Sequence, residues 1–336
     1  MVELLEKLCC LDGTSGDEDA VRDFIISQID GFCEYKTDNL GNIICFKKGK
    51  KQPIKKVMVD AHMDEVGLII SSVTEDGFLK FKTVGGIDVS TLLFRRVKIG
   101  GKINGVICGK PIHLVDGEQR KKLPKADSLY IDIGAKTKKE ALSMVSLGDR
   151  AIVQSEFKVS GDIVKAKAID DRVGCAVIIK LLQDEAEYDF YASFSVQEEI
   201  GLRGAKTAAY GINPDSALVL DATTAADIAG VSDDKSVCNL GKGAVVSFMD
   251  KATVYDKDYY NSAMNSGILC QPKRAVAGGN NGGSVHLSRE GVRTLAMSLP
   301  CRYIHSSSCV ANLNDVQSLF DLTQYMLTGI CDGSIK

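Results

Sequence analysis

Residues 191–211 read YASFSVQEEIGLRGAKTAAYG, and this stretch decides the fold. Its first six residues are mostly apolar, as in a buried strand, and the pattern from Gly201 onward is typical of a helix. Between the two elements stand adjacent carboxylates, Glu198 and Glu199. Neighbouring residues of an extended strand point to opposite faces, so this strand end would direct one acid to each side.

The same alternation of elements recurs on both sides of this stretch. Further strands are predicted at VMVDA, DIVKAKAI, SALVLDAT and VRTLAMSLP, and helices at residues 172–183 and 316–329. Such alternation indicates a layered α/β domain, formed by residues 1–69 and 161–336. Between these parts, residues 70–160 contain short strand-like runs separated by glycines, which predicts an inserted all-β domain.

Near the N-terminus, Ser15 and Glu18 have the spacing of a capping box, which predicts that a helix begins there. The apolar positions Val21, Ile25 and Ile29 would form its buried face.

Composition limits the classes of function. The chain has 336 residues, of which 45% are hydrophobic and 25% charged, as in globular proteins. A net charge of −3 gives no indication of a nucleic-acid partner, and no apolar run approaches the ~18 residues of a membrane span. The eleven cysteines contain no C-x₂-C pair, so we expect free thiols and a cytoplasmic location.

Acids and histidines follow five of the predicted strands. They are His62 with Asp64, Asp170 with Asp171, Glu198 with Glu199, Asp221, and His305. In open α/β sheets, ligands gather outside the carboxyl ends of the strands. One such acid is usually a turn or cap residue, but five strand ends that use two of the four histidines predict a metal site.

Imidazole and carboxylate ligands suit zinc, cobalt or manganese. Three ligating carboxylates carry −3 and two divalent ions carry +4, so one bridging hydroxide would make the site neutral. A bridging hydroxide is also the nucleophile of dimetal hydrolases.

Five motifs resemble those of the M42 family of metallo-aminopeptidases. They are AHMDEVG (61–67), AIDDRVG (168–174), QEEIGLRGA (197–205), LDAT (220–223) and YIHSS (303–307). Residues 83–99, TVGGIDVSTLLFRRVKI, resemble part of the PDZ-like domain that is inserted in this family. The resemblance implies a mixed-sheet dimetal aminopeptidase that removes N-terminal residues from short peptides. It also implies a homo-oligomer, often a tetrahedral dodecamer.

The resemblance assigns metal ligands in two sets that share one carboxylate. The shared ligand is Asp170, and the sets are completed by Glu199 with His305 and by His62 with Asp221. Glu198 would be the general base, which takes a proton from the bridging water and gives it to the leaving amine.

Two more acids would support these ligands. Asp64 would accept the second ring proton of His62, and Asp171 would hold the backbone turn beside the bridging residue.

The sequence departs from the family pattern near the expected substrate pocket. The loop that usually reads GGTDAG contains Asn280 and Asn281, and Ser307 and Cys309 replace a usual proline and glutamate. These changes leave the ligands intact and the side-chain preference open. Of the remaining histidines, His113 is expected to have a structural or subunit-contact role, and His286 follows the glycine-rich loop, which lacks the Lys-Ser/Thr of a phosphate-binding loop.

Other functions fit parts of this pattern. The same ligands would serve a dimetal deacylase or a carboxypeptidase-like enzyme, since the metals do not determine which end of a peptide is bound. Paired acids also occur in glycoside hydrolases, where two carboxyls flank one bond. An inactive scaffold with a retained metal site is the remaining alternative.

Overall fold

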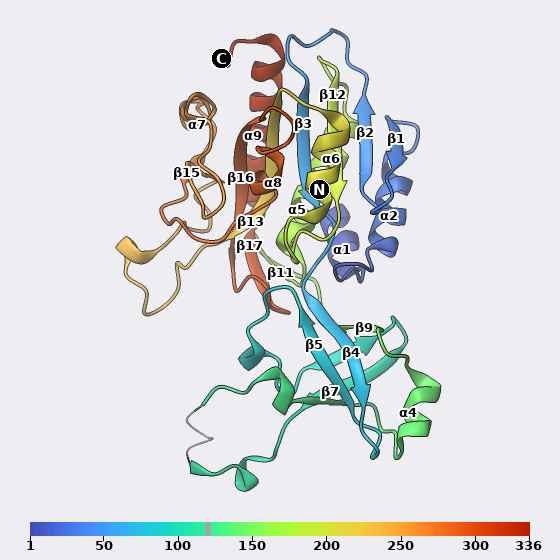
Figure 1. Cartoon of the computed structure of the whole chain (residues 1–336). Helices are drawn as coiled ribbons and strands as arrows, with labels where there is room; N and C mark the ends of the chain where they lie inside the picture. Colours follow the sequence, from blue (N-terminus) through green and yellow to red (C-terminus); the bar gives the residue numbers. More distant parts are fainter. Residues whose placement is uncertain (118–121) are drawn as a thin grey trace.

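The computed structural model describes residues 1–117 and 122–336 of the chain (Figure 1). In this described part, eleven strands form one mixed sheet. Nine of them lie in the order β1 (Glu34–Thr37), β2 (Ile43–Lys47), β12 (Phe190–Ser195), β3 (Val57–His62), β13 (Ser216–Thr224), β16 (Arg293–Arg302), β17 (Cys309–Asn312), β11 (Ile163–Ala166) and β10 (Lys158–Ser160). The other two are β14 (Ala244–Val246), which pairs with β16, and β15 (Cys270–Pro272), which pairs with β14.

The central strands β12, β3, β13 and β16 run parallel, so their carboxyl ends meet at one edge of the sheet. The residue pairs Ser195–His62 and Asp221–Ser298 lie side by side in this register. All six residues of β3 are buried, because helices cover both faces of the sheet. This burial on both faces explains the continuous apolar runs in the sequence.

Two groups of helices pack on the sheet. The first comprises α1 (Val2–Cys10), α2 (Asp19–Ile29), α5 (Ile169–Gln183) and α9 (Leu313–Asp332). The second comprises α6 (Arg203–Ile212) and α8 (Gly282–Val285), and α7 (Lys257–Met264) packs against α9 and β15. The mixed α/β fold expected from the sequence is confirmed.

A second, smaller core lies inside a closed barrel, below the sheet in Figure 1. Its strands follow the order β4 (Gly67–Val73), β5 (Leu79–Val84), β8 (Tyr130–Asp132), β7 (Ile103–Cys108), β6 (Arg96–Ile99) and β9 (Arg150–Val153), with α4 (Lys138–Met144) beside β4. Leu68, Phe81, Val97 and Ile131 fill its interior. The PDZ-like relationship of this barrel stays a proposal.

The division into a discontinuous α/β domain and an inserted barrel domain also stays our proposal. The barrel strands extend from Gly67 to Val153, whereas β10 pairs with β11 in the large sheet. These strand ends favour domain boundaries near residues 66 and 154. The boundaries expected from the sequence, 69/70 and 160/161, lie a few residues away.

The predicted capping box is wrong. Helix α2 begins at Asp19 with Glu18 as its N-cap, and the Glu18 side chain makes no capping hydrogen bond to α2. Instead Ser15 Oγ donates a hydrogen bond to Asp64, 49 residues away, and Glu18 accepts hydrogen bonds from the backbone N–H groups of Gly16 at 2.8 Å and of Gln197 at 3.2 Å. Asp64 and Gln197 are distant in sequence, so the spacing of Ser15 and Glu18 alone could not reveal these contacts.

All eleven cysteines are free thiols. Among the residues that the structure describes, no helix has both the length and the apolar character to cross a membrane.

Candidate metal centre

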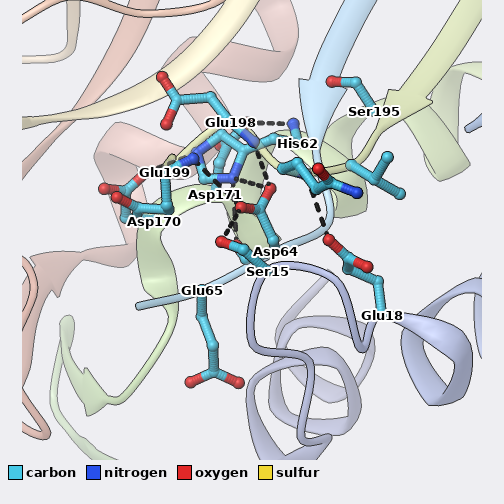
Figure 2. A network of polar contacts seen from close by, with 12 residues as sticks. Ser15, Glu18, His62, Asp64, Glu65, Asp170, Asp171, Ser195, Glu198 and Glu199 are labelled. Carbon is cyan, nitrogen blue, oxygen red and sulfur yellow. Dashed lines mark hydrogen bonds and ion pairs between the residues drawn. The ribbon is translucent and has the colours of Figure 1, made fainter. Parts of the chain in front are cut away.

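The acids and histidines singled out in the sequence meet at the carboxyl edge of the sheet, and Figure 2 shows His62, Asp64, Asp170, Asp171, Glu198 and Glu199 among them. His62 is the last residue of β3, and Asp221 lies near the end of β13. The pair Glu198–Glu199 follows β12, and Asp170 lies in the first turn of α5, where the Asp170–Asp171 peptide bond is cis.

The two oxygens of Asp170 face two different histidines. Oδ1 lies 3.1 Å from His62 Nε2, and Oδ2 lies 3.3 Å from His305 Nε2. His62 Nε2 also lies 4.0 Å from Asp221 Oδ1, and His305 Nε2 lies 3.4 Å from Glu199 Oε2. Ligand atoms of His62, Asp170 and Glu199 all lie within 4.8 Å of one another. The arrangement is therefore two imidazole–carboxylate pairs joined by one carboxylate, and it can hold metal ions.

Asp64 orients both glutamates through their backbone. Its carboxylate accepts hydrogen bonds from the N–H of Glu198 at 2.9 Å and of Glu199 at 3.1 Å, and from Ser15 Oγ at 2.6 Å. The ring of His62 bonds mainly to the main-chain oxygen of Asp64, at 3.1 Å, with the carboxylate 3.4 Å from Nδ1. Asp64 is fully buried, so these are its partners in place of water.

Asp171 holds the backbone on the other side of the ligands. Its carboxylate accepts hydrogen bonds from the N–H of His62 at 3.3 Å and of Gly174 at 2.9 Å. A Cβ atom at position 174 would lie 2.5 Å from this carboxylate, so only glycine fits there. The strand that carries His62 and the helix that carries Asp170 are thereby tied together.

Left-handed backbone conformations occur beside several of the ligands. Ala168, Gln197, Tyr303 and His305 have φ values between 53° and 60°, which are uncommon for residues other than glycine. Such conformations persist where surrounding contacts enforce them, and they concentrate at functional sites. Their position beside Asp170, Glu199 and His305 supports a functional role for this edge.

Burial and mutual charge control the protonation of the acids. Burial, together with the charge of Asp170, raises the pKa of Glu199 and of Asp221 well above the usual range. Burial opposes ionisation of Asp170 as well, but its contacts with His305 and His62 outweigh burial and lower its pKa. Without cations, then, the site keeps protons on part of its ligands, and bound metal ions would displace them.

Glu198 differs from the five candidate metal ligands around it. No hydrogen bond or ion pair joins its carboxylate to another described residue, and burial raises its pKa to about 7. A carboxyl group with a pKa near neutrality can both accept and release a proton, which is the requirement for a general base.

Sequence reasoning missed several residues that support the centre. Cys175 Sγ donates to the main-chain oxygen of His62 at 3.2 Å, and His305 Nδ1 donates to the main-chain oxygen of Gly86 at 2.9 Å. Ser15 and Glu18 were noticed only as a helix signal. Contacts to main-chain atoms leave no residue-type pattern in a sequence, so no sequence signal pointed to them.

The departures from the family pattern lie around the centre and leave its ligands in place. Asn281 is buried and donates hydrogen bonds to Asp60 and Ser195, each at 2.8 Å. Ser307 and Cys309 border a cavity of about 40 Å³ on the barrel side. His286 bonds the main-chain oxygen of Gly282, and His113 is exposed in the barrel, away from the ligands.

Comparison with known proteins identifies the family. A family model described as M42 glutamyl aminopeptidase matches residues 41–322, most of the chain. The chain belongs to the M42 family. It is therefore an enzyme of the peptide hydrolase class, as the resemblance implied, and its similarity to M42 aminopeptidases extends over its full length.

Two relatives illustrate this similarity. A protein of Acetivibrio thermocellus, to which aminopeptidase activity is ascribed, is 37% identical over 98% of each chain. The lysyl aminopeptidase of Pyrococcus furiosus is 31% identical over 97% of this chain and 96% of its own.

Solved structures agree on the fold. An aminopeptidase of Desulfurococcus kamchatkensis has a TM-score of 0.93 and 34% identity, covering 100% of this chain and 97% of its own. The TET1 peptidase of Pyrococcus horikoshii, which assembles into a tetrahedron or an octahedral shell, has a TM-score of 0.84 and 33% identity over 97% and 98%. A Thermotoga maritima protein named endoglucanase has a TM-score of 0.82 and 32% identity over 99% of each chain.

Proposed function

We propose that this M42 enzyme is a dimetal aminopeptidase that removes N-terminal residues from short peptides. The observation that carries the proposal is the position of Asp170, whose two oxygens face His62 and His305 separately. Glu199 and Asp221 then add one carboxylate to each side. In this assignment Glu199 and His305 would hold one ion, His62 and Asp221 would hold the other, and Asp170 would serve both.

The donor set fits two divalent cations. Three buried or half-buried carboxylates and two imidazoles are ligands that zinc, cobalt and manganese accept. Burial and, after it, the negative charge of neighbouring carboxylates raise the pKa values of Glu199 and Asp221, and +4 of metal charge would offset both effects. When bound, such ions polarise a scissile carbonyl and lower the pKa of a water molecule to ~7.

Glu198 is the proposed proton carrier. Its carboxylate takes a proton from the attacking water and passes it to the nitrogen of the leaving amine, so the peptide C–N bond breaks with a neutral leaving group. Asp64 holds the Glu198 backbone through the 2.9 Å hydrogen bond, which fixes where this carboxylate can reach. We therefore assign Asp64 a positioning role.

The assembly and location belong to the same proposal. We infer a homo-oligomer of the tetrahedral, dodecameric type, because the Pyrococcus horikoshii relative forms such shells and matches nearly the whole chain. Light scattering on purified protein would give its mass. The cytoplasmic location rests on the number and spacing of the cysteines.

One experiment tests the activity. Aminoacyl p-nitroanilides with free amines are compared with their N-acetylated forms, in the presence of zinc, cobalt, manganese or a chelator. We expect hydrolysis of the free-amine substrates only, and loss of activity with the chelator. Cleavage confined to the blocked substrates would instead favour a deacylase or carboxypeptidase-like enzyme.

Glucan hydrolysis is a second candidate because one structural neighbour is named endoglucanase. A glycosidase places two carboxyls on either side of one sugar bond, ~5–9.5 Å apart. Here Glu199 Oε2 lies 3.4 Å from His305 Nε2, and Glu198 and Glu199 line the same cavity as Asp170 and Asp221, which favours metal binding over that geometry. Glucan cleavage that persists in a chelator would support the glycosidase.

A further inference from the structure

A cavity of about 450 Å³ lies where the barrel meets the large sheet (Figure 1). Strands β6 and β9 of the barrel border it, as do β11 of the sheet and the loop of Ser307 and Ser308, which closely follows the candidate ligand His305. Ligand pockets usually have volumes of ~300–1,000 Å³, so this cavity has room for part of a substrate.

This cavity adjoins the metal centre. The small cavity of about 40 Å³ described above is bordered by three of the candidate metal ligands, Asp170, Glu199 and His305. The small and the large cavity share four lining residues, which are Ile152, Val153, Lys167 and Ser307. A peptide bound at the metal centre can therefore extend through the small cavity into the large one.

Positive charge is in excess around the large cavity, which we call the basic cavity. Two acids line it, Asp12 and Glu156, against five basic residues, which are Arg95, Arg96, Lys98, Lys165 and Lys167. Both acids already have a lysine nearby, since Glu156 contacts Lys158 at 2.8 Å and Asp12 lies 3.7 Å from Lys167. The lining as a whole therefore carries a net charge of +3.

Four of the five cations have no ion-pair partner in the part of the chain that the structure describes: Arg95, Arg96, Lys98 and Lys165. Exposed basic residues are usually only solvated. Here, however, Arg96 and Lys98 are alternate residues of β6 and point to one face of the barrel, while Lys165 comes from β11 of the sheet. Elements from two separate cores thus bring cations to one concave surface beside the metal centre.

The other cavity at the metal centre has a different charge. It has a volume of about 170 Å³ and is lined by one lysine, Lys273, and four acids, which are Asp170, Glu198, Glu199 and Asp221. Two divalent ions would bring these charges close to balance, whereas the basic cavity keeps its excess of positive charge. Of these two cavities, the basic cavity therefore suits the anionic end of a peptide better.

We propose that the basic cavity binds the C-terminal carboxylate of short peptide substrates. The inference rests on the proposed aminopeptidase function. The carbonyl under attack lies at the metal centre, and the residues that follow it run through the small cavity, so that the carboxylate reaches Arg96, Lys98 and Lys165. Every unmodified peptide ends in a carboxylate, so this contact selects for a free C-terminus and for peptide length, whatever the N-terminal side chain.

The test uses the metal-loaded enzyme and peptides that start with leucine and continue with one to five glycines, each as the free acid and as the C-terminal amide. The two forms differ only in the terminal charge, so the ratio of their kcat/KM values reports recognition of the carboxylate. Contacts between partly exposed charges each contribute a factor of up to ~5, so two or three of them predict a ratio of about 5–50 at the best length. Salt at about 0.5 M should lower this ratio.

Three glutamine substitutions test the residues. The triple variant Arg96→Gln/Lys98→Gln/Lys165→Gln should bring the ratio to within about twofold of 1, and Lys165→Gln alone should lower it by a factor of ~2–5. Lys139→Gln is the matched control, because Lys139 is an exposed lysine of α4 in the same barrel and does not line the cavity. This control should keep the wild-type ratio and its dependence on length.

A ratio is insensitive to a uniform loss of activity, so partial misfolding of a variant would not imitate the effect. A wild-type ratio near 1 at every length, or an unchanged ratio in the triple variant, overturns the inference, while cleavage of the amides leaves the aminopeptidase function standing. A ratio that is equal at all lengths and falls as much in Lys139→Gln shows only an effect of net charge, and it also overturns the inference. If light scattering shows that the triple variant loses its assembly, the cavity is a subunit contact and the inference is wrong. If no free-amine substrate is cleaved by the wild type, the aminopeptidase proposal fails, and this inference fails with it.

Discussion

Replacing Asp64 by asparagine should disrupt the metal centre without removing a ligand. The carboxylate of Asp64 accepts hydrogen bonds from Ser15 and from the N–H groups of Glu198 and Glu199. An asparagine amide keeps one oxygen, so its NH₂ group must face at least one of these backbone donors. A buried donor left without an acceptor costs ~1–3 kcal/mol, and partners behind metal ligands are worth about 10–100-fold in affinity or activity.

We therefore expect Asp64→Asn to lower kcat/KM by about 10–100-fold and to weaken metal binding by a similar factor. The assay combines leucine p-nitroanilide kinetics with metal titration in buffered metal solutions. Ser15→Ala removes a single neutral donor and is the matched control, with an expected loss below about tenfold. If Asp64→Asn keeps kcat/KM and metal affinity within twofold of the wild type, the carboxylate does not organise the site and the reasoning is refuted.

Two further predictions concern stability. Burial raises the pKa of Glu18 to about 7, so below pH 7 the folded state binds a proton that the unfolded state, with a pKa near 4.5, has released. Stability contributed by Glu18 therefore falls as the pH rises from 4.5 to 7, by ~3 kcal/mol at most, and Glu18→Gln should remove this dependence. Relative to the wild type, the Tm of Glu18→Gln should therefore rise as the pH increases from 5 to 7.5. A Tm difference that does not change with pH would contradict the raised pKa of Glu18. At Gly204 in α6, a Cβ atom would lie 2.3 Å from the main-chain oxygen of Val196 and from the side chain of Asn42. Gly204→Ala should cost ~1–3 kcal/mol and lower Tm, whereas Gly211→Ala, where nothing lies within 4 Å, should not; equal Tm values for the two variants would be evidence against tight packing there.

Much of the fold could be predicted from the sequence because its strands are covered on both faces. A strand such as β3 is buried along its whole length, so its sequence is a mostly apolar run and the end of the strand can be located in the sequence. The barrel was visible through its short strands and frequent glycines. Strand order was not visible, because pairing between segments such as β12 and β3, over 100 residues apart, leaves no local pattern.

The site could be predicted to the level of residue types at strand ends. The sequence placed His62, Asp170, Glu199, Asp221 and His305 at such ends, and the structure brings them together. The sequence could not show that Ser15 donates a hydrogen bond to Asp64 instead of capping a helix, because the same hydroxyl group can do either.

The central claim is that Glu198 moves the proton while its neighbour Glu199 holds metal. The most direct measurement is metal content per subunit together with kcat, in the wild type and in the variants Glu198→Gln and Glu199→Gln. The account predicts two metal ions per subunit in the wild type, unchanged content with kcat at least ~100-fold lower in Glu198→Gln, and reduced metal content in Glu199→Gln. Near-wild-type kcat in Glu198→Gln, or loss of its metal, would contradict it.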